Sequence, residues 1–210
     1  MISKLKAGLV TVEGSDGAGK STQIACINQV LVDHGYQTLI TREPGGTALG
    51  EALREVLLNG GEMAIGADAE LMLMFAARAQ HHEEVIQPAL KKGEWVISDR
   101  FTDASYAYQG ARGMSQQRIK QLEAWCLGSF QPHLTLLLDL PLELGLARVD
   151  QRGEKDRFER EDSQYKQQVR EIYLQRAAHE PGRIKVINAS GGVRQVSDQV
   201  TAHLTAFLNA

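Results

Sequence analysis

The chain has 210 residues, a formal net charge of −3 and a pI near 6.1. This length suits one domain with a substantial core, and the weak negative charge excludes the basic surface that duplex nucleic acid requires. No apolar run is long enough to span a bilayer, and residues 1–6 lack the apolar core of a signal peptide, so we expect a cytoplasmic protein.

A glycine-rich motif follows the first expected strand, residues 9–13. Its spacing, G-x-x-x-x-G-K-[ST], is that of a phosphate-binding loop, and a helical pattern over residues 22–32 comes directly after it. Its glycines let backbone N–H groups point at a polyphosphate, while Lys20 would reach the β- and γ-phosphates and the Ser21 hydroxyl would bind Mg²⁺. A glycine-rich connection without a ligand is the alternative. The predicted donor-binding residues are Gly14, Ser15, Asp16, Gly17, Ala18, Gly19, Lys20, Ser21 and Thr22.

Strand and helix patterns alternate along the rest of the chain. The spacing predicts strands at 38–41, 95–98, 134–138 and 184–187. It predicts helices at 47–58, 68–92 (interrupted only by Pro88), 115–127, 142–149, 163–178 and 193–208. Residues 101–114, rich in Gly, Ser and Tyr, are expected to form a loop. The alternation predicts an α/β fold, with a five-stranded parallel sheet and helices on both of its faces.

Two expected strands end in an aspartate, and either carboxylate could hold Mg²⁺, because ligands of such folds bind at the carboxyl ends of strands. Asp99 is favoured, since Arg100 follows it and places an anion-binding guanidinium beside a metal-binding carboxylate. Asp139 is followed by Leu140 and Pro141, which offer no phosphate ligand. A helix or loop cap is the simpler interpretation of Asp139.

A charged segment at residues 150–162 allows two interpretations. Its arginines and the nearby Arg148 are interleaved with acidic residues, which is typical of a solvated helix end. Alternatively, the segment is a mobile flap that brings positive charge to a migrating phosphoryl group while excluding water.

Two further residue pairs carry no predicted chemistry. Adjacent His81 and His82 do not share a helix face, and no His or Cys lies at ligand spacing from them, so we expect no metal site there. Cys26 and Cys126 fall in apolar helical patterns and are expected to be buried free thiols of a reducing compartment.

Three further motifs accompany the phosphate loop: Arg42-Glu43-Pro44-Gly45-Gly46-Thr47, Asp99-Arg100-Phe101 and Ser105-Tyr106-Ala107-Tyr108-Gln109-Gly110. With them the chain resembles the thymidylate kinase family, in its bacterial form, nearly end to end. The Glu-Pro-Gly-Gly-Thr and Ala-Tyr-Gln-Gly segments are not shared with adenylate or guanylate kinases. The resemblance implies a P-loop nucleoside monophosphate kinase architecture in a single domain, residues 1–210, with a mobile lid at 148–162.

The same resemblance implies the reaction and the partners. The γ-phosphoryl group of ATP would pass to dTMP, giving dTDP and ADP, with Mg²⁺ as cofactor. The dTMP phosphate is itself the nucleophile and is ionised at neutral pH, so no strong general base is required. The family is usually homodimeric, and the helices after Asp68 and Ser115 are candidates for the contact.

Roles on the acceptor side follow from the resemblance position by position. Asp16 corresponds to the carboxylate at the deoxyribose 3′-hydroxyl, Arg100 to the arginine on the dTMP phosphate, and Arg78 to the donor to thymine O4. Tyr108 would pack near C2′, where a ribose hydroxyl would clash. Ser105 and Gln109 lie where family members contact the base, and Pro44 would form part of the pocket wall. Family members commonly carry a base-stacking Phe four residues before the helix arginine; here that position is Met74 and the Phe is Phe75, so both are candidates.

The catalytic cation is the second departure from the wider family. Gly17 stands where eukaryotic relatives carry a catalytic arginine, and bacterial relatives supply that arginine from the lid instead. Residues 150–157 are similar to that lid segment, with Arg152 as the first candidate and Arg157 as the second. Lys20, Arg100 and Asp99 complete the expected catalytic set.

Two other functions remain open at this stage. Another nucleoside or nucleotide kinase could share the scaffold, and turnover of dTMP no better than that of dCMP, UMP or AMP would favour it. A nucleotide switch of the GTPase type is the non-enzymatic alternative, although the sequence contains no Asn-Lys-x-Asp run for guanine recognition.

Overall fold

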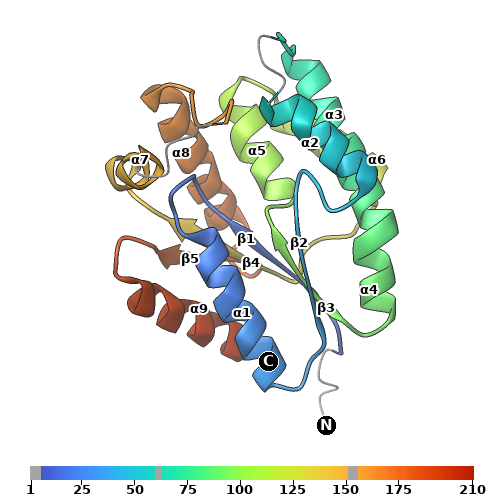
Figure 1. The fold of residues 1–210 in the computed structure, drawn as a ribbon, viewed down its shortest axis with the longest axis vertical. Helices are drawn as coiled ribbons and strands as arrows, with labels where there is room; N and C mark the ends of the chain where they lie inside the picture. Colours follow the sequence, from blue (N-terminus) through green and yellow to red (C-terminus); the bar gives the residue numbers. More distant parts are fainter. Residues whose placement is uncertain (1–5, 60–62, 151–155) are drawn as a thin grey trace.

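The structure, a computed structural model, describes residues 6–59, 63–150 and 156–210. At its centre lies a five-stranded sheet in the order β2-β3-β1-β4-β5, with every neighbouring pair parallel (Figure 1). This confirms the predicted α/β fold. The strands are β1 (Leu9–Glu13), β2 (Thr38–Arg42), β3 (Trp95–Asp99), β4 (Leu134–Asp139) and β5 (Ile184–Asn188).

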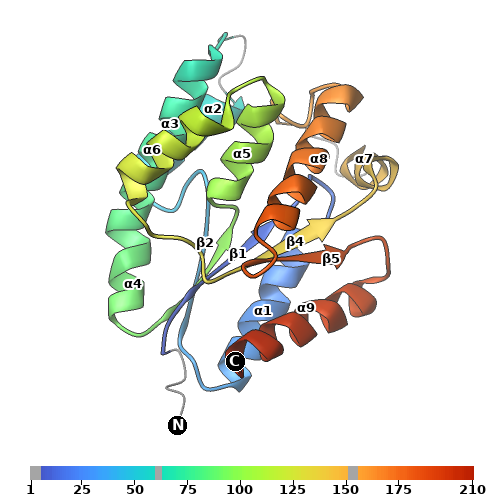
Figure 2. The same cartoon turned by 180° about the vertical axis from the view of Figure 1, so that it is seen from behind.

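Helices cover both faces of this sheet because successive strand residues point to opposite sides. On one face, Val10 and Val12 of β1 pack with α1 (Lys20–Asp33) and α9 (Val193–Leu208), which lie together in Figures 1 and 2. On the other face, Leu9 joins a cluster that includes Ile86 and Leu127. The helices on that side are α3 (Ala67–His81), α4 (Gln87–Lys91), α5 (Thr102–Ala111), α6 (Gln116–Leu127) and α8 (Ser163–His179).

The remaining helices flank the carboxyl edge of the sheet. α2 (Ala48–Asn59) packs beside α3, and α7 (Leu142–Asp150) follows β4. Most bounds agree with the sequence prediction to within one or two residues, which is the usual uncertainty of helix ends. Among the described residues, no helix is both long and apolar enough to cross a membrane.

The loop predicted for residues 101–114 is wrong, because most of this segment is the helix α5. Every residue from Thr102 to Gln109 is buried, so no polar face reveals the helical period in the sequence. Gly110 marks the close approach of α8, since a Cβ there would meet Ile172 at 3.3 Å. The glycine of α5 therefore reflects its tight packing against α8.

The long helix predicted for residues 68–92 is also revised. The chain is helical from Ala67 to Lys91, but a π-helical turn, η1 (His82–Ile86), precedes α4. The Gln87 N–H bonds to the His82 carbonyl, five residues back. Because Pro88 has no N–H and cannot bond four residues back, the wider turn lets the helical path continue through the proline.

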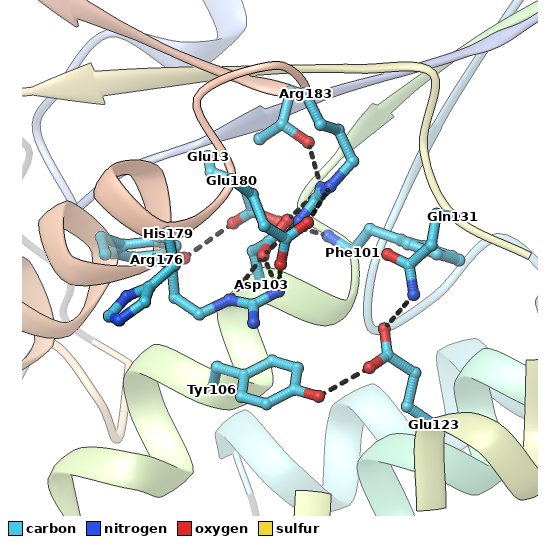
Figure 3. Close-up of polar contacts among 12 residues, drawn as sticks. Glu13, Phe101, Asp103, Tyr106, Glu123, Gln131, Arg176, His179, Glu180 and Arg183 are labelled. Carbon is cyan, nitrogen blue, oxygen red and sulfur yellow. Dashed lines mark hydrogen bonds and ion pairs between the residues drawn. The ribbon is translucent and has the colours of Figure 1, made fainter. Parts of the chain in front are cut away.

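A buried ion cluster joins α5 to α8 behind the sheet edge. Figure 3 shows Arg176 and Arg183 converging on Asp103, with nitrogen to oxygen distances of 2.7 to 3.0 Å. Burial alone would raise the pKa of Asp103, but hydrogen bonds and charge from Arg183 and Arg176 lower it below its usual value. Removing one partner of such a cluster typically costs about 3–5 kcal/mol, so it fixes α8 against α5.

Candidate active site

The register of the sheet brings several polar strand ends to one edge. Asp99 at the end of β3 lies opposite Val12 on β1 and opposite Arg42 on β2. Glu13 follows Val12 directly, and the phosphate loop begins at the next residue, Gly14. The edge therefore gathers charged residues around the loop, as expected for a parallel sheet.

Two glycines give the loop its shape. Gly14 and Gly17 have φ of 136° and 80°, which side chains rarely tolerate. A Cβ on Gly14 would lie 2.5 Å from the Leu138 carbonyl oxygen, and one on Gly17 would lie 2.5 Å from the Gly145 carbonyl oxygen. The loop thus packs against β4 and α7 too closely for any other residue.

Lys20 opens α1 and folds back over the loop. Its Nζ donates to the carbonyls of Gly14 and Ser15, each at 3.3 Å, and lies 3.8 Å from Asp16 Oδ1. Burial, followed by the charge of Arg100, lowers the pKa of the Lys20 ammonium below its usual value. A cation kept close to the loop backbone in this way is placed for anionic oxygens.

The residues beside Lys20 fit a magnesium ion. Asp99 Oδ1 is buried and has no hydrogen-bond partner among the described residues, and Ser21 is exposed at the start of α1. The described residues contain no cluster of three or more metal-binding His, Cys, Asp or Glu side chains. One carboxylate and one hydroxyl suit Mg²⁺, which commonly completes its shell with water and substrate phosphates.

A polar cavity of about 230 Å³ extends from the loop between α2, α3 and α5. It brings together most of the residues predicted for the acceptor, together with Lys20 and Asp99. Those that line it are Asp16, Lys20, Pro44, Met74, Arg78, Asp99, Arg100, Ser105, Tyr108 and Gln109. Phe75, Ser21 and Arg157 are not among its lining residues.

Arg100 lines this cavity and contacts the phosphate loop. Its Nη1 donates to the Gly14 carbonyl at 2.9 Å and its Nη2 to Asp16 Oδ1 at 2.7 Å. The guanidinium carbon lies 4.8 Å from the centre of the Tyr108 ring, and the Tyr108 hydroxyl reaches Asp16 at 3.4 Å. A desolvated, oriented guanidinium of this kind is suited to a phosphate dianion.

Arg78 also lines the cavity and is 3% exposed. Its Nε donates to Glu43 Oε2 at 2.7 Å, and its two Nη atoms donate to Ser105 Oγ and the Phe101 carbonyl, each at 2.9 Å. Three of its five N–H groups are thereby fixed, which leaves two donors for a ligand. The site therefore presents a rigid donor pair to a carbonyl-bearing molecule.

The neighbouring residues Met74 and Phe75 face different environments. Met74 lines the cavity, whereas Phe75 is 1% exposed and packs in a core cluster with Leu71 and Tyr106. The Phe75 ring also supports Arg78 from behind, with 4.6 Å between the guanidinium carbon and the ring centre. Gln109 donates to the buried carboxylate of Glu70 at 2.9 Å, which leaves its own amide oxygen as an acceptor.

The arginines of the predicted lid lie in three different situations. Arg152, the first catalytic candidate, lies outside the described residues. Arg157 donates to Glu70 and to the Leu57 carbonyl. Arg148, on α7, reaches the phosphate loop and donates to the Gly17 carbonyl at 3.2 Å.

Two other predicted positions have structural partners. Asp139 is bound side-on by Arg170, with distances of 2.7 and 3.0 Å, so it is neither a cap nor a cavity residue. Buried His81 bonds to Glu43 at 2.9 Å and to Thr41 at 2.6 Å and so supports the carboxylate that holds Arg78. Cys26 and Cys126 are both free and half-buried.

The sequence assigned no role to four residues that shape the site. Glu43 and Arg54 line the cavity, while Glu13 and Tyr173 support Arg100 from beneath. Glu13 and Glu43 were visible as charged residues at strand ends, a position that favours ligand contact. Nothing in the local pattern indicates that Tyr173, far along the chain, returns to β1.

Comparison with known proteins identifies the family of the chain. The family model described as Thymidylate kinase matches residues 12–200. A thymidylate kinase of Neisseria meningitidis serogroup C is 51% identical over 197 residues, which cover 93% of this chain and 95% of the relative. A thymidylate kinase of Ruthia magnifica is 50% identical over 192 residues, which cover 91% of this chain and 94% of the relative. A thymidylate kinase of Ectopseudomonas mendocina is 49% identical over 202 residues, which cover 96% of this chain and 96% of the relative.

Proposed function

The chain belongs to the thymidylate kinase family, and from this premise we propose which of its residues carry each part of the reaction. The enzyme transfers the γ-phosphoryl group of ATP to dTMP, giving dTDP and ADP, a step of nucleotide biosynthesis. The observation that supports the assignment of roles best is the single cavity that runs from Lys20 and Asp99 to Arg78.

On the donor side, residues 14–22 bind the ATP phosphates through the loop backbone and Lys20. Kinases of this kind use Mg²⁺ with ATP, and the ion would neutralise phosphate charge while held by Ser21 and Asp99. Lys20 and Arg100 supply positive charge on either side of the transferred group. Since the dTMP phosphate is already anionic, catalysis consists of alignment and charge stabilisation.

On the acceptor side, Arg100 binds the dTMP phosphate and Asp16 the 3′-hydroxyl, while Tyr108 packs against C2′. Arg78 donates to thymine O4, with Ser105, Gln109 and Pro44 around the base. The contacts support this arrangement, because Arg100, Asp16 and Tyr108 form one contacting group at the loop, and Arg78, held by Glu43 and Ser105, lines the same cavity.

Selectivity among monophosphates tests the function. We expect ADP release with dTMP to exceed that with dCMP, UMP or AMP by roughly a hundredfold or more in kcat/KM. The bases of dCMP and AMP carry an amino group where Arg78 needs a carbonyl acceptor, and UMP carries a 2′-hydroxyl that would clash with Tyr108. The measurement is a coupled ADP-release assay across this panel. Equal turnover of the other monophosphates would indicate a different nucleotide kinase, and slow hydrolysis that no acceptor accelerates would indicate a switch protein.

Met74, rather than Phe75, is proposed to cover the thymine ring. Met74 lines the cavity, whereas Phe75 is buried behind Arg78 and a thioether packs well on an aromatic ring. In a crystal of the dTMP complex we expect the Met74 side chain against the base and Phe75 unmoved in its core cluster. A Phe75 ring stacked on thymine would contradict this assignment.

The catalytic cation of the lid is proposed to be Arg152. If it meets the transferred phosphoryl group, Arg152→Ala will lower kcat by roughly a few hundredfold or more, approaching the range for arginines in related chemistry. Arg157→Ala is the matched control, because it removes a second lid arginine that Glu70 already binds. Steady-state kinetics decide the point: an unchanged kcat in Arg152→Ala, with a loss in Arg157→Ala, would transfer the role to Arg157.

A homodimer is proposed through one face formed by α2, α3 and α6, which lie side by side in Figures 1 and 2. Trp125 on α6 is 83% exposed, Met72 on α3 is 56% exposed and Leu49 on α2 is 48% exposed. Ala69 and Ala76 extend the apolar stripe of α3. Exposed apolar side chains on three adjacent helices favour an isologous contact between two copies.

Replacing the most exposed aromatic residue of that face tests the dimer. Trp125→Glu is expected to sediment as a monomer at micromolar concentration, while the wild type sediments as a dimer, because the change buries a charge at the contact. Val193→Glu is the control, since Val193 is 65% exposed but lies on α9, on the other side of the molecule. Dissociation by both variants, or a monomeric wild type, would contradict the proposed face.

The organisation of the chain as a single domain with a lid at residues 148–162, and its placement in the cytoplasm, stay predictions. The two free thiols are consistent with a reducing compartment.

A further inference from the structure

Glu13 is a buried carboxylate for which the reaction as described has no use. It ends β1 with no exposed surface, directly before the phosphate loop. Oε1 accepts from the Phe101 backbone N–H at 2.7 Å, a bond shown in Figure 3, and Oε2 accepts from the Tyr173 hydroxyl at 2.7 Å. Neither donor is a cation, so the carboxylate is buried without a direct ion pair among the described contacts, which is costly unless something else depends on it.

Both donors are linked to Arg100, one through the chain and the other through a hydrogen bond. Phe101 is the next residue in the chain, so Glu13 fixes the peptide that follows Arg100. The Tyr173 hydroxyl, which donates to Glu13, accepts from Arg100 Nη1 at 3.2 Å. One carboxylate thus controls Arg100 at its backbone and at its guanidinium.

The backbone of Arg100 needs such support. Its φ of 71° makes it the one non-glycine residue with positive φ among the described residues. A non-glycine residue there is strained and persists only where neighbours determine its conformation. The Ser98 hydroxyl holds the Arg100 carbonyl at 2.7 Å, and Glu13 holds the next N–H, so the strained residue is fixed from both sides.

We propose that Glu13 is a positioning residue for acceptor binding: through Phe101 and Tyr173 it holds Arg100 in the orientation that receives the dTMP phosphate. The inference rests on the proposed role of Arg100 as the phosphate ligand. It adds two residues, Glu13 and Tyr173, whose effect on dTMP is exerted through Arg100 without contact between either and the substrate.

A second buried tyrosine and glutamate pair provides the matched comparison. The Tyr106 hydroxyl donates to Glu123 at 2.6 Å, and Tyr106 is 3% exposed where Tyr173 is 2% exposed. This pair lies between α5 and α6, and neither member lines the cavity (Figure 3). Removing either hydroxyl deprives a buried carboxylate of one donor, but only Tyr173 also contacts Arg100.

The protonation state of Glu13 provides a second way to test the proposal. Burial, followed by the charge of Asp103, raises its pKa from 4.5 to about 7, although Arg100, Tyr173 and the Phe101 N–H oppose the rise. The ionised carboxylate accepts hydrogen bonds from both donors. If Glu13 were protonated, one of its oxygens would become a donor, and the Tyr173 hydroxyl could no longer donate to that oxygen. The titratable or charged groups that face Glu13 are Lys20 from α1, Arg100 from the end of β3, Asp103 and Tyr108 from α5, and Tyr173 from α8.

The first test compares Tyr173→Phe with Tyr106→Phe in the ADP-release assay. Tyr173→Phe is expected to raise KM for dTMP about five- to tenfold, the scale of one ordinary hydrogen bond, with KM for ATP changed less than about twofold. Tyr106→Phe is expected to leave both KM values near those of the wild type, even if the two variants lose similar thermal stability. Equal KM values for dTMP in the two variants would overturn the inference.

The second test uses Glu13→Gln, which is close in shape to protonated glutamate. The ratio of wild-type to variant kcat/KM for dTMP, taken at each pH, cancels the titration of the dTMP phosphate that both enzymes share. We expect this ratio to fall toward one between pH 8 and pH 6, as Glu13 gains its proton. A ratio that is flat with pH would show that the charge of Glu13 has no part in dTMP binding.

The outcomes separate this inference from the function itself. If the wild type phosphorylates dTMP but the Tyr173 and Tyr106 variants behave alike, only the role of Glu13 and Tyr173 fails. If the wild type does not phosphorylate dTMP, the proposed role of Arg100 and this inference fail together. Should Glu13→Gln not fold, the tyrosine pair alone still decides the question.

Discussion

The contact between Arg100 and the phosphate loop is the constraint on which the rest of the site depends. Arg100 follows β3, yet its guanidinium bonds to Gly14 and Asp16 at the end of β1. The bond joins the strand end that would hold the acceptor to the loop that would hold the donor. Parallel pairing of β1 with β3 is what makes it possible, since Val12 and Asp99 are directly opposite. The two substrates of an in-line transfer thereby share one rigid frame.

The charges buried beneath this contact act on stability in opposite directions. Asp103 has a lowered pKa, so it contributes stability above its unfolded pKa and loses it as the pH falls through the folded value. Glu13 has a raised pKa, so it keeps its proton to a higher pH in the folded state than in the unfolded state. Stability therefore falls as the pH rises from 4.5 to about 7. The cost of ionised Glu13 is on the order of 3 kcal/mol. The ion cluster of Asp103 with Arg176 and Arg183, which anchors the helix carrying Tyr173, helps to offset it.

Local sequence pattern could predict the parts of this protein that depend on short spacing. The phosphate loop and the strands follow from glycine spacing and from apolar runs. The helix α5 could not be recognised, because burial on all sides removes the amphipathic signal. The role of Asp139 could not be predicted for a different reason, because its partner Arg170 lies on α8, 31 residues further along the chain. Tyr173 and Glu13 are separated by 160 residues, and only the packing of α8 brings them together.

The choice between the two lid arginines also depends on a buried carboxylate. Glu70 on α3 has no exposed surface and accepts from Arg157 and from Gln109, so it connects Arg157 to a residue that lines the cavity. Moving Arg157 to the phosphates would leave Glu70 with Arg112, 3.6 Å away, as its remaining cationic partner among the described residues. Breaking a buried pair typically costs about 3–5 kcal/mol, which would cancel much of what a catalytic arginine supplies. Arg157 is therefore better suited to fastening the lid segment onto α3, and this favours Arg152 as the cation that meets the transferred phosphoryl group.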